Sequence, residues 1–581
     1  MQSWKHDLLM NESSWDGTFL SWKTDFGKHV LEQFPLPDGS EPIPPDQPLQ
    51  PKLLLETLPQ IQTSHQSDVT SQGRNLNNQQ STSHPDVSPN NFSLSESTAN
   101  FPPIMTSDNP LPAAPLAPWI TPPPSVCQQL KEPHPDIKLP LDKDLPPDTL
   151  LNIRRGKTCE LLYNKRVTPQ SHWQDVRQLT LLVPDHATWL PGDVVTIYPK
   201  NFPDDVQALI DLQEWNEYAD VPLQLVKSTT SYQTNIRTSI VSGIPESLRL
   251  VKGSTLRDLL TNNLDITAIP KRNFLQNMSY FTSDAMHRER LQEFCQPLYT
   301  DEFFDYCTRP RRSILEVLTD FPTVKFPWNQ AAWIFPSIRG RQFSIANSSE
   351  TAEWHQDSSE REVELLVAIV KYRTVLKKIR QGLCSRYLSS LEEGSKMQIS
   401  FDRPSDKFYD LAFREKKRPI IMIAAGTGIA PCRNLIQERT SLASQRRSQD
   451  EQMGKMLLIY GSRNHSSDYF FQDDWISRDI SKHLTVKTAF SRDQRDKIYV
   501  QDIIKRDKEE IYKLIEEGAV IYVCGSAGAM PKSVRQAILD VLCEFVDVGS
   551  GLERVEEVVK EKSEVLLEQM SKVGRYVEEV W

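Results

Sequence analysis

The sequence has few cysteines, no long apolar run and no excess of basic residues. Eight cysteines in 581 residues, without a Cys-x-x-Cys pair, exclude a disulfide-built scaffold and a zinc ribbon, and no metal site is predicted. No apolar run approaches the roughly 20 residues that a membrane-spanning helix needs. A net charge of -10 argues against a nucleic-acid-binding protein, which is usually basic. Because the first residues also lack the apolar core of a signal peptide, a cytoplasmic protein is expected.

Proline is concentrated in one part of the chain. Of the 41 prolines, 24 lie between Pro35 and Pro147, among tracts rich in Ser, Asn and Gln. Such a composition buries too little apolar surface to offset chain entropy, so residues 38–147 are predicted to be a mostly disordered linker. Within it, PKLLLETLP (51–59) is expected to dock only transiently. The preceding residues, 1–37, contain one segment with apolar residues at helical spacing, from Phe19 to Phe34.

Residues 148–412 have the pattern of an antiparallel barrel interrupted by helices. Strand-like runs at 177–183 and 193–199 are separated by the turn sequence LPGD, and strands resume at 341–348 and 363–375. Between them, residues from about 203 to 310 have helical periodicity. The sequence therefore predicts a barrel with an inserted helical domain.

Residues 413–581 alternate between short apolar runs and helical stretches. Four such runs, at 419–426, 455–462, 484–491 and 519–526, end in small residues. This alternation predicts a doubly wound α/β unit with a parallel sheet. Ligands bind such sheets at the carboxyl ends of the strands, so the small residues indicate one crevice.

Two motifs of this second unit fit phosphate groups. Gly426, Thr427 and Gly428 follow an apolar strand and open a helix, where free N–H groups and the helix dipole attract anions. After the strand ending at Ser491 and Arg492, the loop continues through Lys497, Tyr499 and Gln501. These side chains suit a phosphate monoester such as the 2′-phosphate of NADP, and Tyr499 could stack on adenine. An ordinary strand-to-helix turn and a solvated charged loop are the alternatives.

The barrel region contains two further motifs, which fit phosphate groups and a flavin ring. Alternation along RQFS (341–344) puts Arg341 and Phe343 on one face, where they could neutralise a pyrophosphate and lie against a flavin, with Gln342 and Ser344 on the other. A second phosphate cradle, with Gly382 and Ser385, is predicted at a helix start in QGLCSRYL. An edge strand and a helix cap are the alternatives. A lone cysteine such as Cys524 is more often a packed apolar residue than a reactive one.

The order of these motifs carries more information than any one of them. RxFS, GxxS, GTGxAP, SRxxxxKxYxQ, CGS and a C-terminal aromatic residue follow one another, and this order resembles the ferredoxin–NADP reductase superfamily. The segments RPRRSILEVLTDFP, GRQFSIANSS and FSRDQRDKIYVQD look most like the NADPH-dependent diflavin oxidoreductases of cytosolic iron–sulfur assembly. The resemblance covers residues 148–581. It implies an FAD-binding barrel with a helical connecting domain at 203–310, followed by an NADP-binding domain at 413–581.

The resemblance also implies the roles of individual residues. Expected FAD contacts are Arg311 (with Arg312 as an alternative), Arg341, Gln342, Phe343, Ser344, Gly382, Leu383, Cys384 and Ser385. Expected NADPH contacts are Thr427, Ser491, Arg492, Lys497, Ile498, Tyr499, Val500 and Gln501. Trp581 matches an aromatic residue that covers the flavin ring and moves aside for nicotinamide. Ser344, Cys524, Glu579 and Trp581 are expected to form the catalytic group for hydride transfer.

The activity implied is hydride transfer from NADPH to FAD, with electrons passing through FMN to an iron–sulfur assembly protein in the cytosol. Association with mitochondria is a further property that the resemblance implies. FMN is expected for the family, but its flavodoxin-like domain is largely absent from this sequence, and residues 1–37 resemble only the end of it. Two alternatives remain: a reductase of another diflavin branch serving a haem or sulfite partner, and an incomplete remnant acting as an interaction module.

Overall fold

The computed structural model describes residues 47–58, 144–148, 155–184, 187–228, 246–355, 360–374, 378–444, 453–545 and 556–581, with residues 151 and 153 and eight positions between 22 and 33. Those eight positions are helical, and the rings of Trp22 and Phe26 stack 5.1 Å apart, one helical turn from each other. Most of the predicted linker, 38–147, and of the predicted remnant, 1–37, lies outside the described residues. No helix in the described ranges combines the length and apolar character that crossing a bilayer requires.

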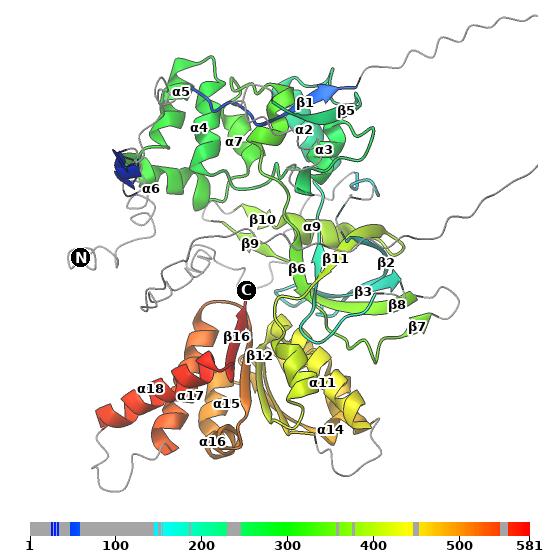
Figure 1. The fold of residues 1–581 in the computed structure, drawn as a ribbon, viewed down its shortest axis with the longest axis vertical. Helices are drawn as coiled ribbons and strands as arrows, with labels where there is room; N and C mark the ends of the chain where they lie inside the picture. The colour runs from blue at the N-terminus through cyan, green and yellow to red at the C-terminus, as the bar shows by residue number, and fades with distance from the viewer. Residues whose placement is uncertain are drawn as a thin grey trace, which may run out of the picture. The chain divides into compact units, whose positions relative to one another are not determined.

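The predicted antiparallel barrel is confirmed as a seven-stranded sheet (Figure 1). The strand order is β6-β4-β11-β2-β3-β8-β7. The strands are β2 (Lys157–Arg166), β3 (Val176–Pro184), β4 (Val194–Ile197), β6 (Arg341–Ser344), β7 (Trp354–His355), β8 (Glu360–Ala368) and β11 (Lys396–Asp402). A bridge between Ile345 and Leu365 brings the end of β6 to β8, so the sheet curls around a core that includes Leu161, Leu181 and Val195.

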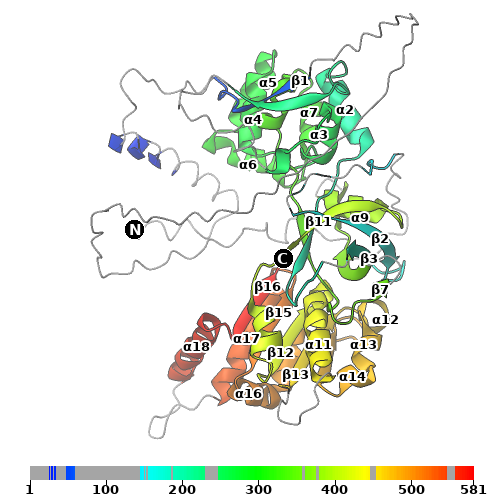
Figure 2. The ribbon, with the colours of Figure 1, turned by 45° about the vertical axis from the view of Figure 1, so that its right-hand side comes forward.

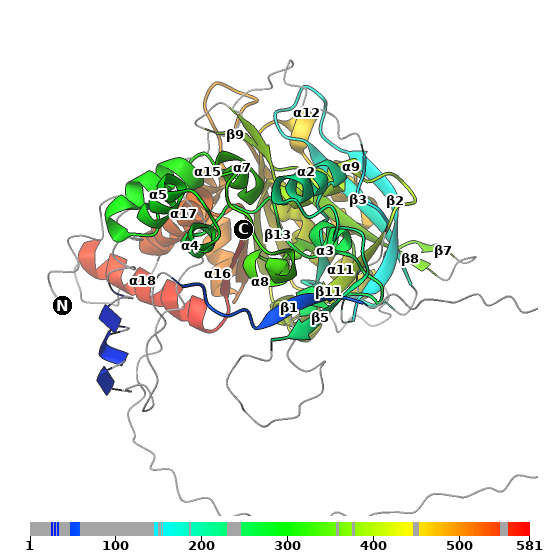
Figure 3. The same cartoon turned by 90° about the horizontal axis from the view of Figure 1, so that it is seen from above.

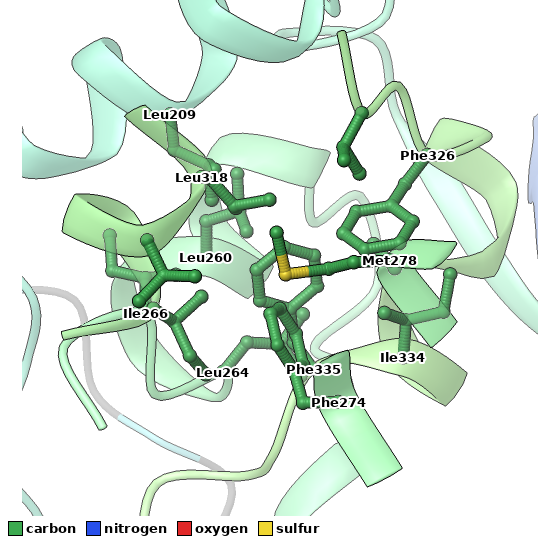
Figure 4. Packing of buried hydrophobic residues seen from close by; sticks show 14 of the residues in the cluster. Leu209, Leu260, Leu264, Ile266, Phe274, Met278, Leu318, Phe326, Ile334 and Phe335 are labelled. Atoms are coloured by element: carbon green, nitrogen blue, oxygen red, sulfur yellow. The ribbon is translucent and has the colours of Figure 1, made fainter. Parts of the chain in front are cut away.

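Helices α2 to α8 form the predicted insert between β4 and β6. They are α2 (Pro203–Gln213), α3 (Leu256–Asn262), α4 (Arg272–Tyr280), α5 (Ala285–Glu293), α6 (Thr300–Phe303), α7 (Ile314–Asp320) and α8 (Ala331–Ile334). Figure 4 shows Phe274, Met278, Phe326 and Phe335 packed together in the core of the insert. The core of the insert continues past the predicted end at about residue 310, because α7 and α8 bury their apolar residues in it.

The insert also holds a strand pair that corrects one prediction. Residues Leu53–Thr57 form β1, which pairs antiparallel with β5 (Leu223–Lys227) at the edge of the insert (Figure 3). Leu55 is 1% exposed and belongs to the core of the insert. The disorder predicted for 38–147 is therefore wrong for these residues. The apolar run within PKLLLETLP is held in place by hydrogen bonds to a strand far away in the sequence, which its proline-rich surroundings do not reveal.

The second unit is the predicted parallel sheet, in the order β14-β13-β12-β15-β16. The expected strands appear as β12 (Ile420–Ala425), β13 (Met456–Ser462), β14 (Leu484–Phe490) and β15 (Val520–Gly525), and β16 (Tyr576–Val580) is added beside β15. Helices α11 (Ile429–Ser444), α13 (Gln472–Ile476) and α14 (Arg478–Ser481) contribute to one face, and α12 (His465–Asp468) follows β13. Helices α15 (Val500–Arg506), α16 (Lys508–Glu516), α17 (Ala529–Phe545) and α18 (Glu556–Lys572) cover the other face (Figure 2).

Helix α11 joins the parallel sheet to the barrel through buried polar contacts. Arg433 donates to Glu364 Oε2 (2.5 Å) and to the carbonyl of Ala346 (3.1 Å) on the barrel, and its Nε donates to Asp474 Oδ2 (2.6 Å) beside the sheet. One turn further along α11, Ser348 Oγ donates to Glu438 Oε2 (2.5 Å). These contacts begin directly after β6, so they fix the end of that strand against the start of α11.

Replacing Arg433 with leucine is expected to lower the free energy of unfolding by about 3 kcal/mol, because two carboxylates would lose the cation that compensates their burial. Urea unfolding followed by fluorescence measures this change. Lys455→Met is the matched control, since it removes an exposed partner of Glu517 and should change the free energy by less than about 1 kcal/mol. Equal unfolding midpoints for the two variants would contradict the prediction.

Candidate active site

The first anion cradle lies where helix α9 (Leu383–Ser390) begins. Gly382 is its N-cap residue, and its carbonyl accepts the first helical hydrogen bond, from Arg386 N (2.8 Å). Ser385 Oγ accepts from Val370 N (3.0 Å), which ties the first turn to the preceding chain. A side chain at Gly382 would meet nothing closer than 3.7 Å. The glycine is therefore not required by packing, and it leaves the N–H groups of the first turn open to an approaching anion.

Arg341 acts electrostatically on Cys384 in the first turn of this helix. Burial raises the pKa of the Cys384 thiol to about 12, and the guanidinium of Arg341 opposes that rise, so the two side chains are close enough to interact. Arg341 Nη1 also donates to the carbonyl of Arg339 (2.7 Å). A guanidinium beside a helix N-terminus fits the pyrophosphate of a dinucleotide.

The remaining residues of β6 differ in burial, since Gln342 is exposed whereas Phe343 and Ser344 are half-buried. Phe343 pairs with Val195 and packs on the barrel core, whereas Gln342 pairs with Thr196. Gln342 and Thr196 line a surface hollow of about 500 Å³, together with Arg341. Ser344, half-buried, ends the strand opposite Val194.

Of the two candidate arginines in RPRRS, Arg311 faces this site. It has a left-handed φ of 51°, and its guanidinium lies 4.9 Å from the ring centre of Tyr372. Tyr372 belongs to β9 (Lys371–Arg373), which pairs with β10 (Ile379–Gln381) directly before Gly382. Arg312 instead donates to Asp320 (2.7 Å) and lies over Tyr306, inside the insert. Sequence reasoning missed Tyr372, an aromatic residue only ten positions before the predicted cradle.

The insert is attached to this hairpin by Glu316. Its carboxylate accepts from Arg380 Nη1 (2.7 Å) and from Lys378 Nζ. Burial would raise its pKa, but these cations and the N–H of Ser313 outweigh that effect and lower it to about 2. The ion pairs hold α7, and with it the preceding Arg311, beside the α9 cradle.

The second part of the site lies at the carboxyl ends of β12 and β15. Gly426 has a left-handed φ of 56°, and a side chain at Gly428 would come within 2.4 Å of the carbonyl oxygen of Cys524. Both glycines are thus required, one by its backbone and one by the closeness of β15. Half-buried Thr427 lies between them at the entry to α11.

Cys524, Glu579 and Trp581 are brought together by the last two strands. Glu579 lies opposite Cys524 in the β15–β16 register, and the Tyr522 hydroxyl donates to its carboxylate. Burial raises the pKa of Cys524 well above its usual range, with Cys432 and Glu579 adding to the effect. Trp581 N donates to Gly525 O (3.2 Å), and Ala527 N donates to Trp581 O (2.8 Å). Trp581 as a whole residue is 48% exposed.

The end of β6 and the end of β15 share one apolar core. Ala346, two residues after Ser344, belongs to the same cluster as Cys432 and Cys524. Asn434 of α11 also donates to the carbonyl of Ile345 (3.3 Å). The contacts of α11 therefore connect the segment that follows Ser344 with the strand end at Cys524.

A second cationic site lies at the ends of β13 and β14. Ser491 N donates to Ser462 O (3.0 Å), and Arg492 N donates to Arg463 O (2.8 Å), so two Ser-Arg pairs lie side by side. Burial and the charge of Arg492 together lower the pKa of Arg463 to about 10, against the opposing effects of Asp468 and Tyr499. Two neighbouring guanidinium groups and a phenol fit a dianionic phosphate monoester.

Arg463 was missed by sequence reasoning, although a signal was present. YGSR and AFSR end adjacent strands with the same Ser-Arg pair, and the carboxyl ends of parallel strands meet at one edge of the sheet.

Not all of the predicted NADPH contacts after Arg492 reach the surface. Lys497, Ile498 and Tyr499 are exposed and Gln501 is half-buried, but Val500 is 3% exposed and packs against Gly461. The Val500 side chain is therefore packed inside the domain.

Comparison with known proteins identifies both domains. Residues 158–387 match the FAD binding domain family, and residues 422–536 match the oxidoreductase NAD-binding domain family. The chain is 38% identical over 576 residues to NADPH-dependent diflavin oxidoreductase 1 of Emericella nidulans, covering 98% of this chain and 77% of the relative. For the same-named protein of Aspergillus fumigatus, identity is 37% over 572 residues, covering 97% and 76%. For that of Schizosaccharomyces pombe, it is 35% over 438 residues, covering 75% and 67%.

These matches confirm the predicted family, its oxidoreductase activity and its FAD and NADPH cofactors. The two cationic groups of residues described above lie within or next to the matched ranges, one in each domain. The chain belongs to the NADPH-dependent diflavin oxidoreductase family.

Proposed function

We propose that the chain oxidises NADPH through bound FAD and passes the electrons to an iron–sulfur assembly protein in the cytosol. The observation that carries the first half is the shared core of the β6 and β15 ends, with one cationic anion site on each side of it. The second half rests on the resemblance of the sequence to reductases of that pathway. FMN, expected for the family as the relay to the acceptor, and an association with mitochondria belong to the same proposal.

On the barrel side, the proposed FAD ligands combine charge, a ring and backbone N–H groups. Arg341 and the first turn of α9 would bind the pyrophosphate, and Phe343 would lie against the flavin. Arg311 would close the site from the insert. The remaining proposed contacts are Gln342, Ser344, Gly382, Leu383, Cys384 and Ser385, of which Cys384 is buried and would contribute its backbone.

On the parallel-sheet side, the proposed NADPH ligands follow the strand ends. Ser491 and Arg492 would bind the 2′-phosphate with Arg463, and Tyr499 would stack on adenine. Thr427 would lie at the GTG turn. The exposed and half-buried members of the following segment, Lys497, Ile498 and Gln501, complete the proposed contacts, with Val500 restricted to its backbone.

When bound together, NADPH supplies a hydride and FAD accepts it, so the chain's task is to orient the two rings and stabilise developing charge. The Cys524 thiol stays protonated at neutral pH, since its pKa is raised, and it would act as a hydrogen-bond donor rather than a nucleophile. Ser344 would donate from the barrel side. Glu579 would favour the positive charge of the oxidised nicotinamide, and Trp581 would cover the flavin until nicotinamide enters.

An absorbance spectrum with flavin extraction, followed by anaerobic NADPH titration of the purified chain, tests the proposal. We expect bound FAD that is bleached by about one equivalent of NADPH. Mixing the reduced protein with an oxidised iron–sulfur assembly protein should then restore the oxidised flavin spectrum. Faster reoxidation by a haem protein or a sulfite-reducing protein would favour another diflavin branch, and a colourless protein would favour an inactive remnant.

A further inference from the structure

The loop between β2 and β3, residues 167–175, is fixed by its own hydrogen bonds. Arg166 Nε donates to the carbonyl of Thr168 (3.0 Å), and its Nη2 donates to the carbonyl of Pro169 (3.0 Å). Thr168 Oγ1 donates to the carbonyl of Gln174 (2.8 Å) and accepts from Val176 N (3.1 Å). The loop therefore holds a defined shape at the end of the barrel sheet.

The tip of this loop contacts the parallel-sheet unit at Arg463. The guanidinium carbon of Arg463 lies 3.7 Å from the ring centre of Trp173. His172 Nε2 lies 3.7 Å from Asp468 Oδ2, and the same carboxylate accepts from the backbone N–H of Arg463 (3.0 Å). Asp468 therefore fixes the backbone of Arg463, and the ring of Trp173 packs against the face of its guanidinium.

Two observations indicate that the ring serves to position the guanidinium. The indole Nε1 of Trp173 is buried without a hydrogen-bond partner among the described residues, so the side chain is placed for its face. Within the same ranges, neither the Arg463 nor the Arg492 guanidinium lies within salt-bridge distance of a carboxylate; burial and the charge of Arg492 lower the pKa of Arg463 and outweigh the Asp468 carboxylate, which raises it. The face of an indole orients a cation without neutralising it, and both guanidinium groups remain available to an anion.

We infer that Trp173, a residue of the FAD-binding barrel, is a positioning residue that orients Arg463 and thereby sets the preference for NADPH over NADH. This inference rests on the proposed NADPH site. It places part of the coenzyme specificity outside the NADP-binding domain. Recognition of the 2′-phosphate would then also depend on the contact between the barrel and the parallel-sheet unit. Hydride transfer requires the same contact, because each unit holds one of the two cofactors.

The test compares full-length Trp173→Ala and Trp173→Phe with the unmodified protein, using an artificial one-electron acceptor. In Trp173→Ala, the KM for NADPH should rise about tenfold, while kcat and the KM for NADH change less than about twofold. The inhibition constant of 2′,5′-ADP should rise with the KM, and that of 5′-AMP should not. Trp173→Phe, which keeps an aromatic face, should recover most of the preference for NADPH.

A double-mutant cycle separates positioning from general damage. In an Arg463→Ala background, Trp173→Ala should have no further effect on the KM for NADPH, because the group that it orients is gone. Parallel increases in the KM of both coenzymes, or additive effects in the cycle, would overturn the inference while leaving the proposed function intact. Failure of NADPH to reduce the flavin of the unmodified protein would overturn both. The FAD content and the melting temperature of each variant show whether the fold is retained. A variant whose FAD content or melting temperature falls together with its preference for NADPH would count against a positioning role.

Discussion

Replacing Cys524 with alanine is expected to slow reduction of bound FAD by NADPH about 100-fold, the usual effect of removing one donor aimed at developing charge. The dissociation constant of NADPH should change much less, because the proposed 2′-phosphate site lies at other strands. Cys524 is buried at the end of β15, opposite Glu579, and its raised pKa keeps a proton on sulfur at neutral pH. Anaerobic stopped-flow absorbance at saturating NADPH measures the rate directly.

Cys432 provides the matched control for this experiment. It is a second buried cysteine of the same core, and it lies on α11 rather than at a strand end. Cys432→Ala removes the same thiol volume from the same cluster and should leave the rate of flavin reduction within about threefold of the unmodified value. An unchanged rate in Cys524→Ala, or equal losses in the two variants, would show that Cys524 only packs.

The parallel-sheet side of the site could be predicted because its signals are local. Four apolar runs end in small residues, and the topology of a parallel sheet brings those ends to one edge. Ser491 and Arg492 therefore had a predictable place before any contact was known. The same reasoning could have found Arg463, whose Ser-Arg pair repeats the pattern one strand away. It could not have revealed the indole of Trp173 against Arg463, since the two residues are nearly 300 positions apart in sequence.

The errors arose where tertiary contacts decide the local structure. The segment Leu53–Thr57 is short and has prolines on both sides, so its sequence does not indicate a strand. Its backbone hydrogen bonds are made with β5, far away in the sequence. Strand β16 was not predicted because Glu578 and Glu579 interrupt its apolar character, yet pairing with β15 fixes its place. The insert continues past residue 310 because α7 contributes Val317 and Leu318 to its core. Its boundary depends on that packing, which periodicity does not reveal.

Replacing Arg492 with alanine is expected to raise the KM for NADPH about 30-fold and to leave the KM for NADH nearly unchanged. A hydrogen bond to a charged group contributes about 1.5–3 kcal/mol, and only NADPH carries the phosphate that would accept it. The backbone bond from Arg492 N to Arg463 O does not involve the side chain, so the loop should keep its shape. Steady-state kinetics with both coenzymes, repeated at high salt, measure the effect.

Arg495→Ala is the control, because it removes the same charge from an exposed position three residues along the same loop. A change confined to long-range electrostatics would affect both variants alike and would fade as salt screens it. A direct contact with the 2′-phosphate predicts a loss specific to Arg492 that persists in part at high salt. Equal increases in KM for NADPH and NADH in Arg492→Ala would place the phosphate elsewhere. They would also leave the neighbouring Arg463 and Arg492 at the ends of β13 and β14 without a proposed ligand.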